Sequence, residues 1–307
     1  MADHASPPTR RLLFESLGIS VVDFRCHAGV EKLGIEEPNP THSIVFVRRG
    51  VFGRSHEDGT LVADPNHVLF FNAAQPYRYS HPVAGGDDCT ILAVETARAL
   101  ELVARHAPRD ACPERPFRYS HGLSSRHAAQ LHWELLRLVD RPALRLALED
   151  ILAELADEAV GSAYRPPGEP IQRLRGLAQA GRRHRELAEA AKLVLNERMD
   201  APPSLGDLAG ILGCSSFHLS RTFHGTVGLS LRQYVKRLRA RLAAERLAAG
   251  ARDLTSLALD FGYFDHSHFT KSFRHEWGIP PSRFRAGRSA SEPARDLLEP
   301  RRARRAI

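Results

Sequence analysis

Two stretches of the sequence repeat the same chemistry. HLSRTF (218–223) and HFTKSF (268–273) share the order His, apolar, Ser or Thr, basic, Ser or Thr, Phe, at an offset of fifty residues. The basic positions are Arg221 and Lys271. On an exposed helix face, such groups can donate hydrogen bonds to the guanine acceptors in the major groove of DNA. The repeat therefore predicts two equivalent basic surfaces.

The residues around each stretch divide into two sets at helical spacing. Leu219 and Phe223 in the first copy, and Phe269 and Phe273 in the second, are predicted to pack inward. The opposite face, predicted to be exposed and to meet DNA, carries Phe217, Ser220, Arg221 and His224 in the first copy, and Ser267, Thr270, Lys271 and Arg274 in the second. One solvated amphipathic helix would show the same division, but two copies with a basic residue at the same outer position favour a binding surface.

A shorter helix and a turn are predicted before each stretch. Ser204 is a good N-cap after two prolines, and Asp207 is placed for a variant of the capping box. Gly213 is predicted to end this helix, and Gly262 has the matching place in the second copy. Each copy is therefore read as a helix-turn-helix, whose second helix enters the major groove.

The segment between the copies predicts one long helix. LRQYVKRLRARLAAERLAAG has an apolar stripe, basic residues on its other faces and Gly250 as a stop. About 19 helical residues span roughly 28 Å. That length is close to the roughly 34 Å between successive major-groove faces of a duplex. The predicted helix could thus hold the two recognition helices near consecutive turns of DNA.

The N-terminal part has a different pattern. Between Thr41 and Glu95, short runs rich in Val, Ile, Phe and Tyr alternate with turn signals, which predicts an antiparallel β-barrel or jelly roll. Tyr77 and Tyr79 are two residues apart on a predicted strand, so their side chains share one face. If that face lines the interior of the barrel, both are candidates for contacting a ligand there.

A helical period follows from Ser124, with Pro142 predicted to separate two helices. Their apolar faces either cap the barrel or pair with a second subunit, and the sequence leaves both open. A linker rich in Pro and Gly is expected at 161–170. The apolar positions of the two predicted helices are Leu131, Leu135, Leu138, Leu144, Leu148, Ile151, Leu152 and Leu155.

Charge is unevenly divided along the chain. The formal net charge is +7, but residues 182–288 alone carry 18 Lys and Arg against 10 Asp and Glu, a surplus of 8. A basic block joined to a slightly acidic one is typical of a nucleic-acid-binding domain attached to a second domain. The start of the chain lacks the apolar core of a secretory signal, and no apolar run suggests a membrane span, so a cytoplasmic protein without membrane contact is expected.

Cysteine and histidine spacing predicts no metal site and no cofactor. The four cysteines are scattered, which favours reduced, mostly buried thiols, although Cys26 and His27 could form a sensor with Cys89 or Cys112 if the fold brings them together. His266 and His268 point about 200° apart on a helix and cannot easily share an ion. No His-x-His pair of the kind that metal-binding cupins use occurs around His42, His56, His67 or His81.

The C-terminal sequence resembles a known family. LGDLAGILGCSSFHLSRTF, the basic connecting helix and LALDFGYFDHSHFTKSFRHEWGIPPSRFR resemble the double helix-turn-helix domain of AraC/XylS bacterial transcription regulators, over residues 188–285. The resemblance implies that Phe217, Ser220 and Arg221, and Ser267, His268, Thr270 and Lys271, lie at or near DNA. Leu231 stands where the family often has Pro. More weakly, the N-terminal region resembles the family's cupin-like effector domain, which implies a small-molecule ligand.

These observations predict an α+β multidomain protein that is not an enzyme. We expect a cupin-like β-barrel sensor at 1–120, a helical dimerisation segment and linker at 121–181, an all-α double helix-turn-helix at 182–288 and a disordered tail at 289–307. Expected partners are double-stranded DNA, a small-molecule effector, a second copy of the chain and RNA polymerase. The rival interpretation is a cupin-type metalloenzyme with an accessory helical domain; a third is a protein-interaction module.

Overall fold

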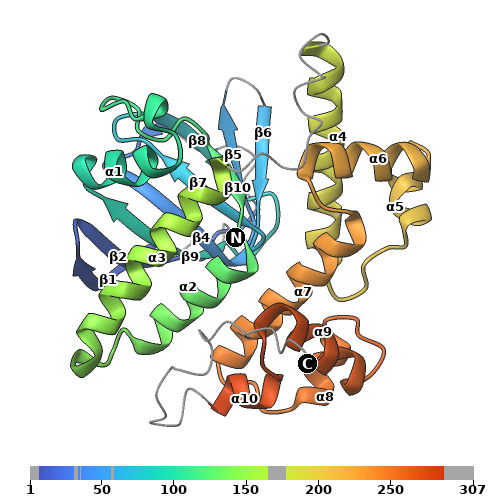
Figure 1. The fold of residues 1–307 in the computed structure, drawn as a ribbon. Coiled ribbons are helices and arrows are strands. Elements are labelled where there is room, and N and C mark those ends of the chain that lie inside the picture. The colour runs from blue at the N-terminus through green and yellow to red at the C-terminus, as the bar shows by residue number, and fades with distance from the viewer. Residues whose placement is uncertain (1–6, 31–33, 35, 57–58, 165–177, 287–307) are drawn as a thin grey trace, which may run out of the picture.

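The computed structural model describes residues 7–30, 34, 36–56, 59–164 and 178–286, and Figure 1 shows a sheet-rich N-terminal part beside an all-helical C-terminal part. The expected α+β architecture is thereby confirmed. The strands are β1 (Thr9–Ser16), β2 (Ile19–Cys26), β3 (Glu36–Pro38), β4 (His42–Gly50), β5 (Phe52–His56), β6 (Gly59–Ala63), β7 (His67–Phe71), β8 (Pro76–Ser80), β9 (Asp87–Val94) and β10 (His121–Leu123).

The strands form two antiparallel sheets. The larger sheet has the order β1-β2-β9-β4-β7-β10, and the smaller has the order β3-β8-β5-β6. Side chains alternate across β4: Ile44 and Phe46 pack toward the helices, whereas Val45 and Val47 pack toward the smaller sheet. This period of two is what a strand buried on both faces requires.

A closed barrel is not found among the described residues. β5 pairs with β6 and β8 rather than with an edge of the larger sheet, so the larger sheet ends at β1 and β10 and the smaller at β3 and β6. The chain crosses between the sheets at Gly50, whose φ is 79°. A Cβ there would lie 2.0 Å from the carbonyl oxygen of Gly86, so only glycine fits this crossing.

Helices cover the outer face of the larger sheet. Leu131, Leu135 and Leu138 of α2 are buried in one core with Ile44 and Phe46, so the predicted apolar faces are covered within the chain. Leu144 is an exception to the predicted stripe because it lies in a short 3₁₀ turn between α2 and α3 and is 37 % exposed. The helical elements here are α1 (Thr96–His106), η1 (Pro108–Asp110), α2 (Arg126–Leu138), η2 (Pro142–Leu144) and α3 (Arg145–Tyr164).

The C-terminal part is built entirely from helices around a second core. Leu208, Phe223, Tyr234 and Phe273 are buried there together. None of the helices in the described ranges is both long and apolar enough to cross a membrane. The helices are α4 (Ala178–Glu197), α5 (Leu205–Ile211), α6 (Ser216–Val227), α7 (Leu231–Ala248), α8 (Leu254–Asp260), α9 (His266–Trp277) and α10 (Pro281–Ala286).

A buried polar cluster joins the two parts. Asp64, in the loop after β6, accepts hydrogen bonds from Asn196 Nδ2 (2.9 Å), Tyr234 Oη (2.5 Å), the Asn66 amide (2.8 Å) and His67 Nδ1 (3.0 Å). Burial alone would raise the pKa of this carboxyl, but the facing His67 and the hydrogen bonds outweigh burial and lower the pKa to about 2. A fully satisfied buried charge of this kind fixes how α4 and α7 sit on the sheet.

Arg241 makes a second buried connection between the parts. Its guanidinium, on α7, pairs with Glu276 of α9 at 3.0 Å and donates to the carbonyl oxygens of Pro65 (2.8 Å) and Ser124 (2.9 Å). One side chain therefore ties α7 both to the second helix-turn-helix and to two loops of the sheet domain. The planar, five-donor guanidinium suits such multiple bonding.

His132 should make stability depend on pH. It lies in α2, stacked on Phe46 at 4.8 Å between ring centroids, and burial, aided by the nearby charges of Arg48 and Arg241, lowers its pKa to about 3. Between roughly pH 6.5 and 3 the unfolded chain binds a proton that the folded chain does not. Stability should therefore fall by about 1 kcal/mol as the pH drops from about 6.5 to 5.5.

Urea unfolding of the parent and of His132→Phe at both pH values checks this expectation. The Phe ring keeps the stacking but cannot titrate, so the variant should lose this share of the pH dependence. An equal shift of the midpoint in both proteins would contradict the assignment.

Candidate nucleic-acid interface and ligand cavity

The two copies of the repeated phrase fold into two helix-turn-helix units, α5–α6 and α8–α9. Ser204 caps α5 through the Asp207 amide, as predicted. Gly213 and Gly262 make the turns with φ values of 65° and 64°, a conformation that favours glycine. α6 and α9 then begin at the N-caps Ser215 and Asp265. The cap role of Asp265 was expected from the sequence.

The predicted division of α6 is present in the structure. Leu219 and Phe223 are fully buried, whereas Arg221 and His224 are exposed and Ser220 is half-buried. Phe217 exposes 76 % of its surface, which is unusual for a large apolar side chain in the first turn of a helix. This face is therefore accessible to a partner.

The same division recurs on α9. Phe269 and Phe273 are fully buried. Thr270 is half-buried, while the remaining predicted contact residues on α9 are exposed: Ser267, His268, Lys271 and Arg274. α6 and α9 thus each present one basic residue at the same position of the repeat, Arg221 and Lys271.

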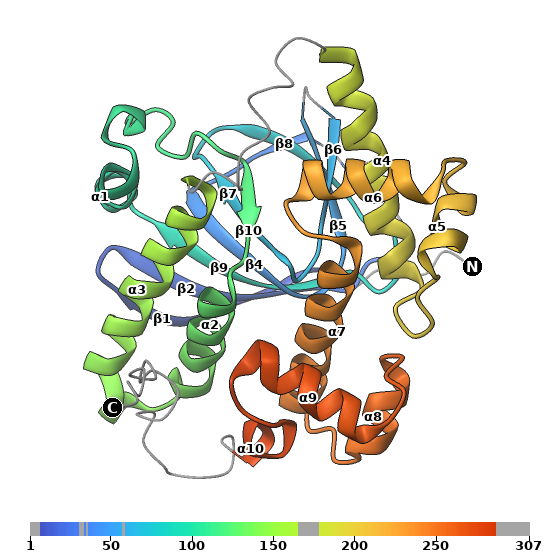
Figure 2. The ribbon, with the colours of Figure 1, turned by 45° about the vertical axis from the view of Figure 1, so that its right-hand side comes forward.

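α7 connects the two units as a continuous helix of 18 residues (Figure 2). Its start is held by a capping box of Ser230 and Gln233, so Leu231 begins the helix without the proline that often stands there. Its length is about 27 Å. α6 and α9 lie near opposite ends of this rod.

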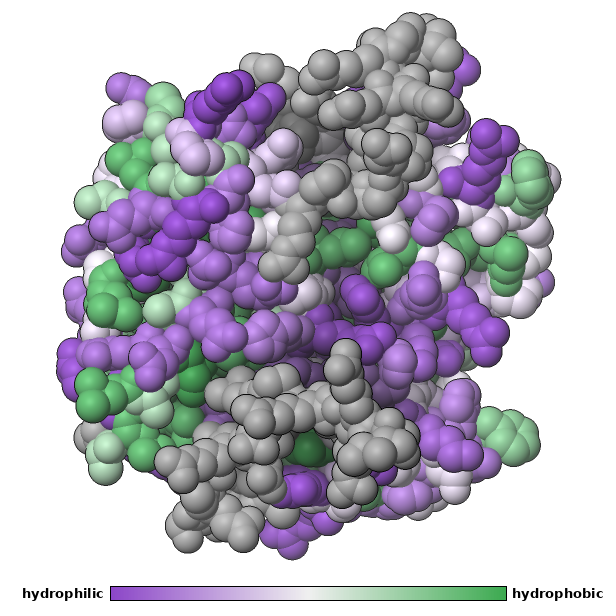
Figure 3. All heavy atoms as spheres, viewed as in Figure 1, coloured by the Kyte–Doolittle hydropathy of each residue, from purple (hydrophilic) through white to green (hydrophobic). Residues whose placement is uncertain are grey.

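A basic hollow runs along α7 between the units. It has a volume of about 680 Å³ and is lined by Arg232, Lys236 and Arg239 of α7, with His268 and His275 of α9. Figure 3 shows hydrophilic residues gathered along α7 between α6 and α9. Such a surface can attract phosphates without reading sequence.

One exposed aromatic side chain escaped the sequence interpretation. Phe264, directly before the N-cap of α9, is 86 % exposed, while its neighbour Tyr263 is only 4 % exposed. Adjacent side chains at a helix start point in different directions, so two consecutive aromatics cannot both enter the core. That argument could have identified Phe264 as a second exposed aromatic beside Phe217.

Known proteins match the helical part of the chain. The family model described as "Helix-turn-helix domain" matches residues 208–287. The regulatory protein SoxS of Salmonella typhimurium is 28% identical over 102 residues, which covers 33% of this chain and 95% of SoxS. The HTH-type transcriptional activator AarP of Providencia stuartii is 34% identical over 82 residues, 27% of this chain and 61% of AarP. This protein is a DNA-binding transcriptional regulator of the AraC family.

Solved structures are also similar to this chain. An AraC-type regulator from Chromobacterium violaceum is 27% identical to this chain. The match covers 35% of this chain and 95% of that regulator, with a TM-score of 0.32. ToxT from Vibrio cholerae, in a structure with a bound unsaturated fatty acid, is 12% identical, and the match covers 90% of this chain and 97% of ToxT with a TM-score of 0.33.

The sheet domain of the AraC-family regulator contains a cavity of about 750 Å³. Tyr77 and Tyr79, the predicted effector contacts, are half-buried and line it, together with the apolar rings of Phe24 and Phe71. A mostly apolar hollow with a few polar groups is the usual form of a small-molecule site.

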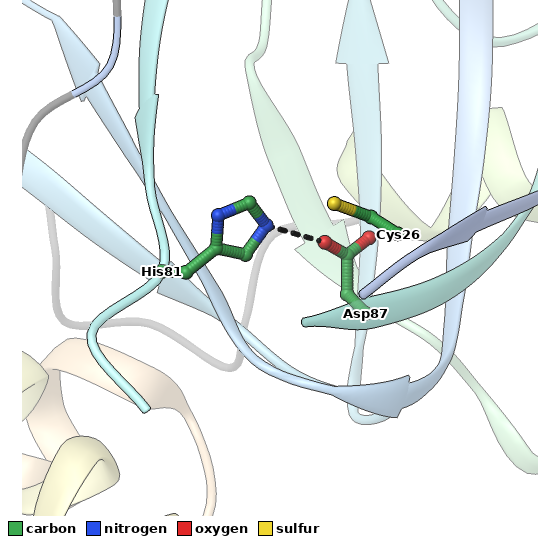
Figure 4. A group of neighbouring side chains, drawn as sticks. All are labelled: Cys26, His81 and Asp87. Carbon is green, nitrogen blue, oxygen red and sulfur yellow. Dashed lines mark hydrogen bonds and ion pairs between the residues drawn. The ribbon is translucent and has the colours of Figure 1, made fainter. Parts of the chain in front are cut away.

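Three potential metal ligands meet in this cavity of the AraC-family regulator, a grouping that the sequence interpretation did not predict. One ligand atom each of Cys26, His81 and Asp87 lie within 4.8 Å of one another. Asp87 accepts a hydrogen bond from His81 Nε2 at 3.0 Å (Figure 4) and another from Cys89 Sγ at 3.0 Å. His81 and Asp87 are six positions apart, but Cys26 lies far upstream of both, so spacing carried no signal of the whole group.

The cysteines only partly match expectation. Cys89 is buried, Cys26 and Cys214 are half-buried and Cys112 is exposed, so the prediction of mostly buried thiols is wrong for Cys112. Burial and the neighbouring Asp87 raise the pKa of the Cys89 thiol. Cys26, His27 and Cys89 do line one cavity, whereas Cys112 hydrogen-bonds Glu114 elsewhere.

Proposed function

We propose that α6 and α9 read successive major-groove segments of one operator. The observation that carries this proposal is the pair of exposed basic side chains, Arg221 and Lys271, at equivalent positions on two helices joined by α7. Each can donate to the O6 and N7 of guanine. The length of α7, about 27 Å, fits a spacing of roughly one helical turn.

The other outer residues complete the proposed contact surface. Phe217 supplies an apolar face for a thymine methyl group, as can the methyl of the half-buried Thr270. The remaining polar contacts are assigned to base edges or phosphates: Ser220, His224, Ser267, His268 and Arg274. Arg232 and Lys236 in the basic hollow add phosphate attraction.

We assign the sheet domain the role of an effector domain with a cupin-like jelly roll. The effector is a small molecule in the 750 Å³ cavity, in contact with Tyr77 and Tyr79. β7 offers a route from cavity to DNA, because Phe71 at one end lines the cavity and His67 at the other joins the Asp64 cluster under α7. A ligand shifts DNA binding only if it favours one arrangement of these contacts over another.

We propose that the regulator acts in the cytoplasm as a homodimer without enzymatic activity and contacts RNA polymerase when bound to DNA. The working domains are residues 1–120, 121–181 and 182–288; the proposed tail, 289–307, lies outside the described residues. Because the apolar faces of α2 and α3 are covered by the sheet, dimer contacts would use their exposed residues, such as Leu146 at 78 % exposure.

Selection from a random duplex pool at near-physiological salt tests this function. The full chain should enrich one sequence with two boxes about one helical turn apart. Enrichment of a single box would contradict the role of the second helix, and no enrichment, with and without a library of candidate effectors, would contradict the proposal as a whole.

A further inference from the structure

Three donor groups surround the carboxylate of Asp87 in the lining of the cavity. His81 Nε2 lies 3.0 Å from one carboxylate oxygen and Cys89 Sγ lies 3.0 Å from the other. The Cys26 sulfur joins the group within 4.8 Å. His81 and Asp87 are 3 % and 4 % exposed, so these two donors are largely withdrawn from water, while Cys26 is half-buried.

The backbone holds these donors together. Cys26 ends β2 and Asp87 begins β9, and the two residues are direct partners in the antiparallel ladder. The turn before Asp87 passes so close to Cys26 that a Cβ on Gly86 would lie 2.0 Å from the Cys26 carbonyl oxygen. Gly86 has a φ of 68°, which favours glycine. The approach of these strand ends is thus a property of the fold rather than of side-chain rotamers alone.

The arrangement does not suit a nucleophilic triad. In a Cys-His-Asp relay the thiol and the carboxylate bond to opposite nitrogens of the imidazole. Figure 4 shows the Cys26 sulfur and the Asp87 carboxylate on the same side of the His81 ring, facing Nε2. Donors that converge on one point suit a shared ion instead.

The donor types indicate which ion. Thiolate and imidazole favour Zn²⁺ and similar transition metals, whereas Mg²⁺ and Ca²⁺ prefer oxygen ligands only. Ligand atoms around tetrahedral Zn²⁺ lie roughly 3.3–3.8 Å apart, given bonds of about 2.0–2.3 Å. The ligand atoms of Cys26, His81 and Asp87 lie within 4.8 Å of one another, so they would need to move only slightly closer together to hold the ion.

We propose that Cys26, His81 and Asp87, with Cys89 as the adjoining fourth donor, bind one divalent transition-metal ion of the Zn²⁺ type. On binding, the coordinating thiols release their protons to solvent, and His81 takes the tautomer with hydrogen on Nδ1, which frees Nε2 for the ion. Binding of the ion is a property of this group alone and holds whether or not the cavity controls DNA affinity.

Cobalt titration of the reduced, metal-free full chain tests the site. Co²⁺ replaces Zn²⁺ in tetrahedral sites and absorbs light, so the parent should bind one ion per chain with a thiolate-to-cobalt charge-transfer band, and added Zn²⁺ should displace it. Absence of the thiolate band in the parent overturns the proposal.

Variants locate the ion. Cys26→Ser should weaken the band and lower affinity at least about tenfold, because even the loss of an outer-sphere partner costs roughly 10–100-fold. His81→Gln should lower affinity to a similar extent while keeping the thiolate band, and it serves if Cys26→Ser fails to fold by circular dichroism. The matched control, Cys112→Ser, removes an exposed thiol outside the group and should bind like the parent. Parent-like titrations of folded Cys26→Ser or His81→Gln overturn the assignment.

Discussion

The double variant Arg221→Ala/Lys271→Ala should lose sequence-specific DNA binding. Each single substitution removes a donor that can bond guanine in a different groove segment, and each should cost about 1–3 kcal/mol, or roughly 5- to 150-fold in affinity. The two residues lie on separate helices near opposite ends of α7, so their effects should add, giving a combined loss of at least roughly 25-fold. Binding to the selected operator, measured at fixed salt, checks this.

The loss should be specific to sequence. Affinity for random DNA should fall much less, because each variant removes only one positive charge and the basic hollow along α7 remains. Each single variant should also relax base preference in one box only. Arg109→Ala is the matched control, because Arg109 is exposed on η1 in the sheet domain. Parent-like affinity of the folded double variant would show that the outer faces of α6 and α9 are not the reading surfaces.

Replacing Asp64 by alanine should destabilise the junction between the two parts by about 3–5 kcal/mol. The substitution strands the buried hydroxyl of Tyr234 and removes one of the two acceptors of the half-buried Asn196 amide. Removing one member of a buried charged network leaves its partners unsatisfied, which is why the cost is large. Urea unfolding followed by the fluorescence of Trp133 and Trp277 should show an earlier midpoint, because Trp277 lies in the core of the helical part and Trp133 of α2 packs against it.

The charge of Asp64 can be tested separately by pH. Its pKa is lowered from 3.8 to about 2, so the folded state gains stability above pH 4 that it loses as the pH falls from about 4 to 2. Asp64→Asn keeps the shape of the side chain but cannot ionise, so the variant should not show the loss of stability between about pH 4 and 2 that Asp64 causes. Asp150→Ala, at an exposed position of α3, should change stability by less than about 0.5 kcal/mol. A parent-like midpoint for Asp64→Ala would contradict the role of the cluster.

Local sequence was enough for the helical part. The inner and outer sets of α6 and α9 could be predicted because helical spacing alone decides which side chains share a face. Caps and turns such as Ser204, Gly213 and Asp265 were equally predictable, since each acts on backbone groups within a few residues of itself. The repeat removed the remaining ambiguity, because a chance pattern in one copy is not expected in the second.

Tertiary structure alone decided how the two parts meet and what the cavity contains. The contacts of Asp64 with Tyr234 and of Arg241 with Pro65 join residues separated by 170 and 176 positions. Cys26 reaches Asp87 only because β2 and β9 are neighbours in the sheet. Strand order and domain docking depend on long-range pairing, and such pairing leaves no periodic signal within a single segment. The amino-acid pattern therefore determined the two helix-turn-helix units and their inner and outer faces, whereas packing between distant strands and helices determined the junction and the cluster of donors.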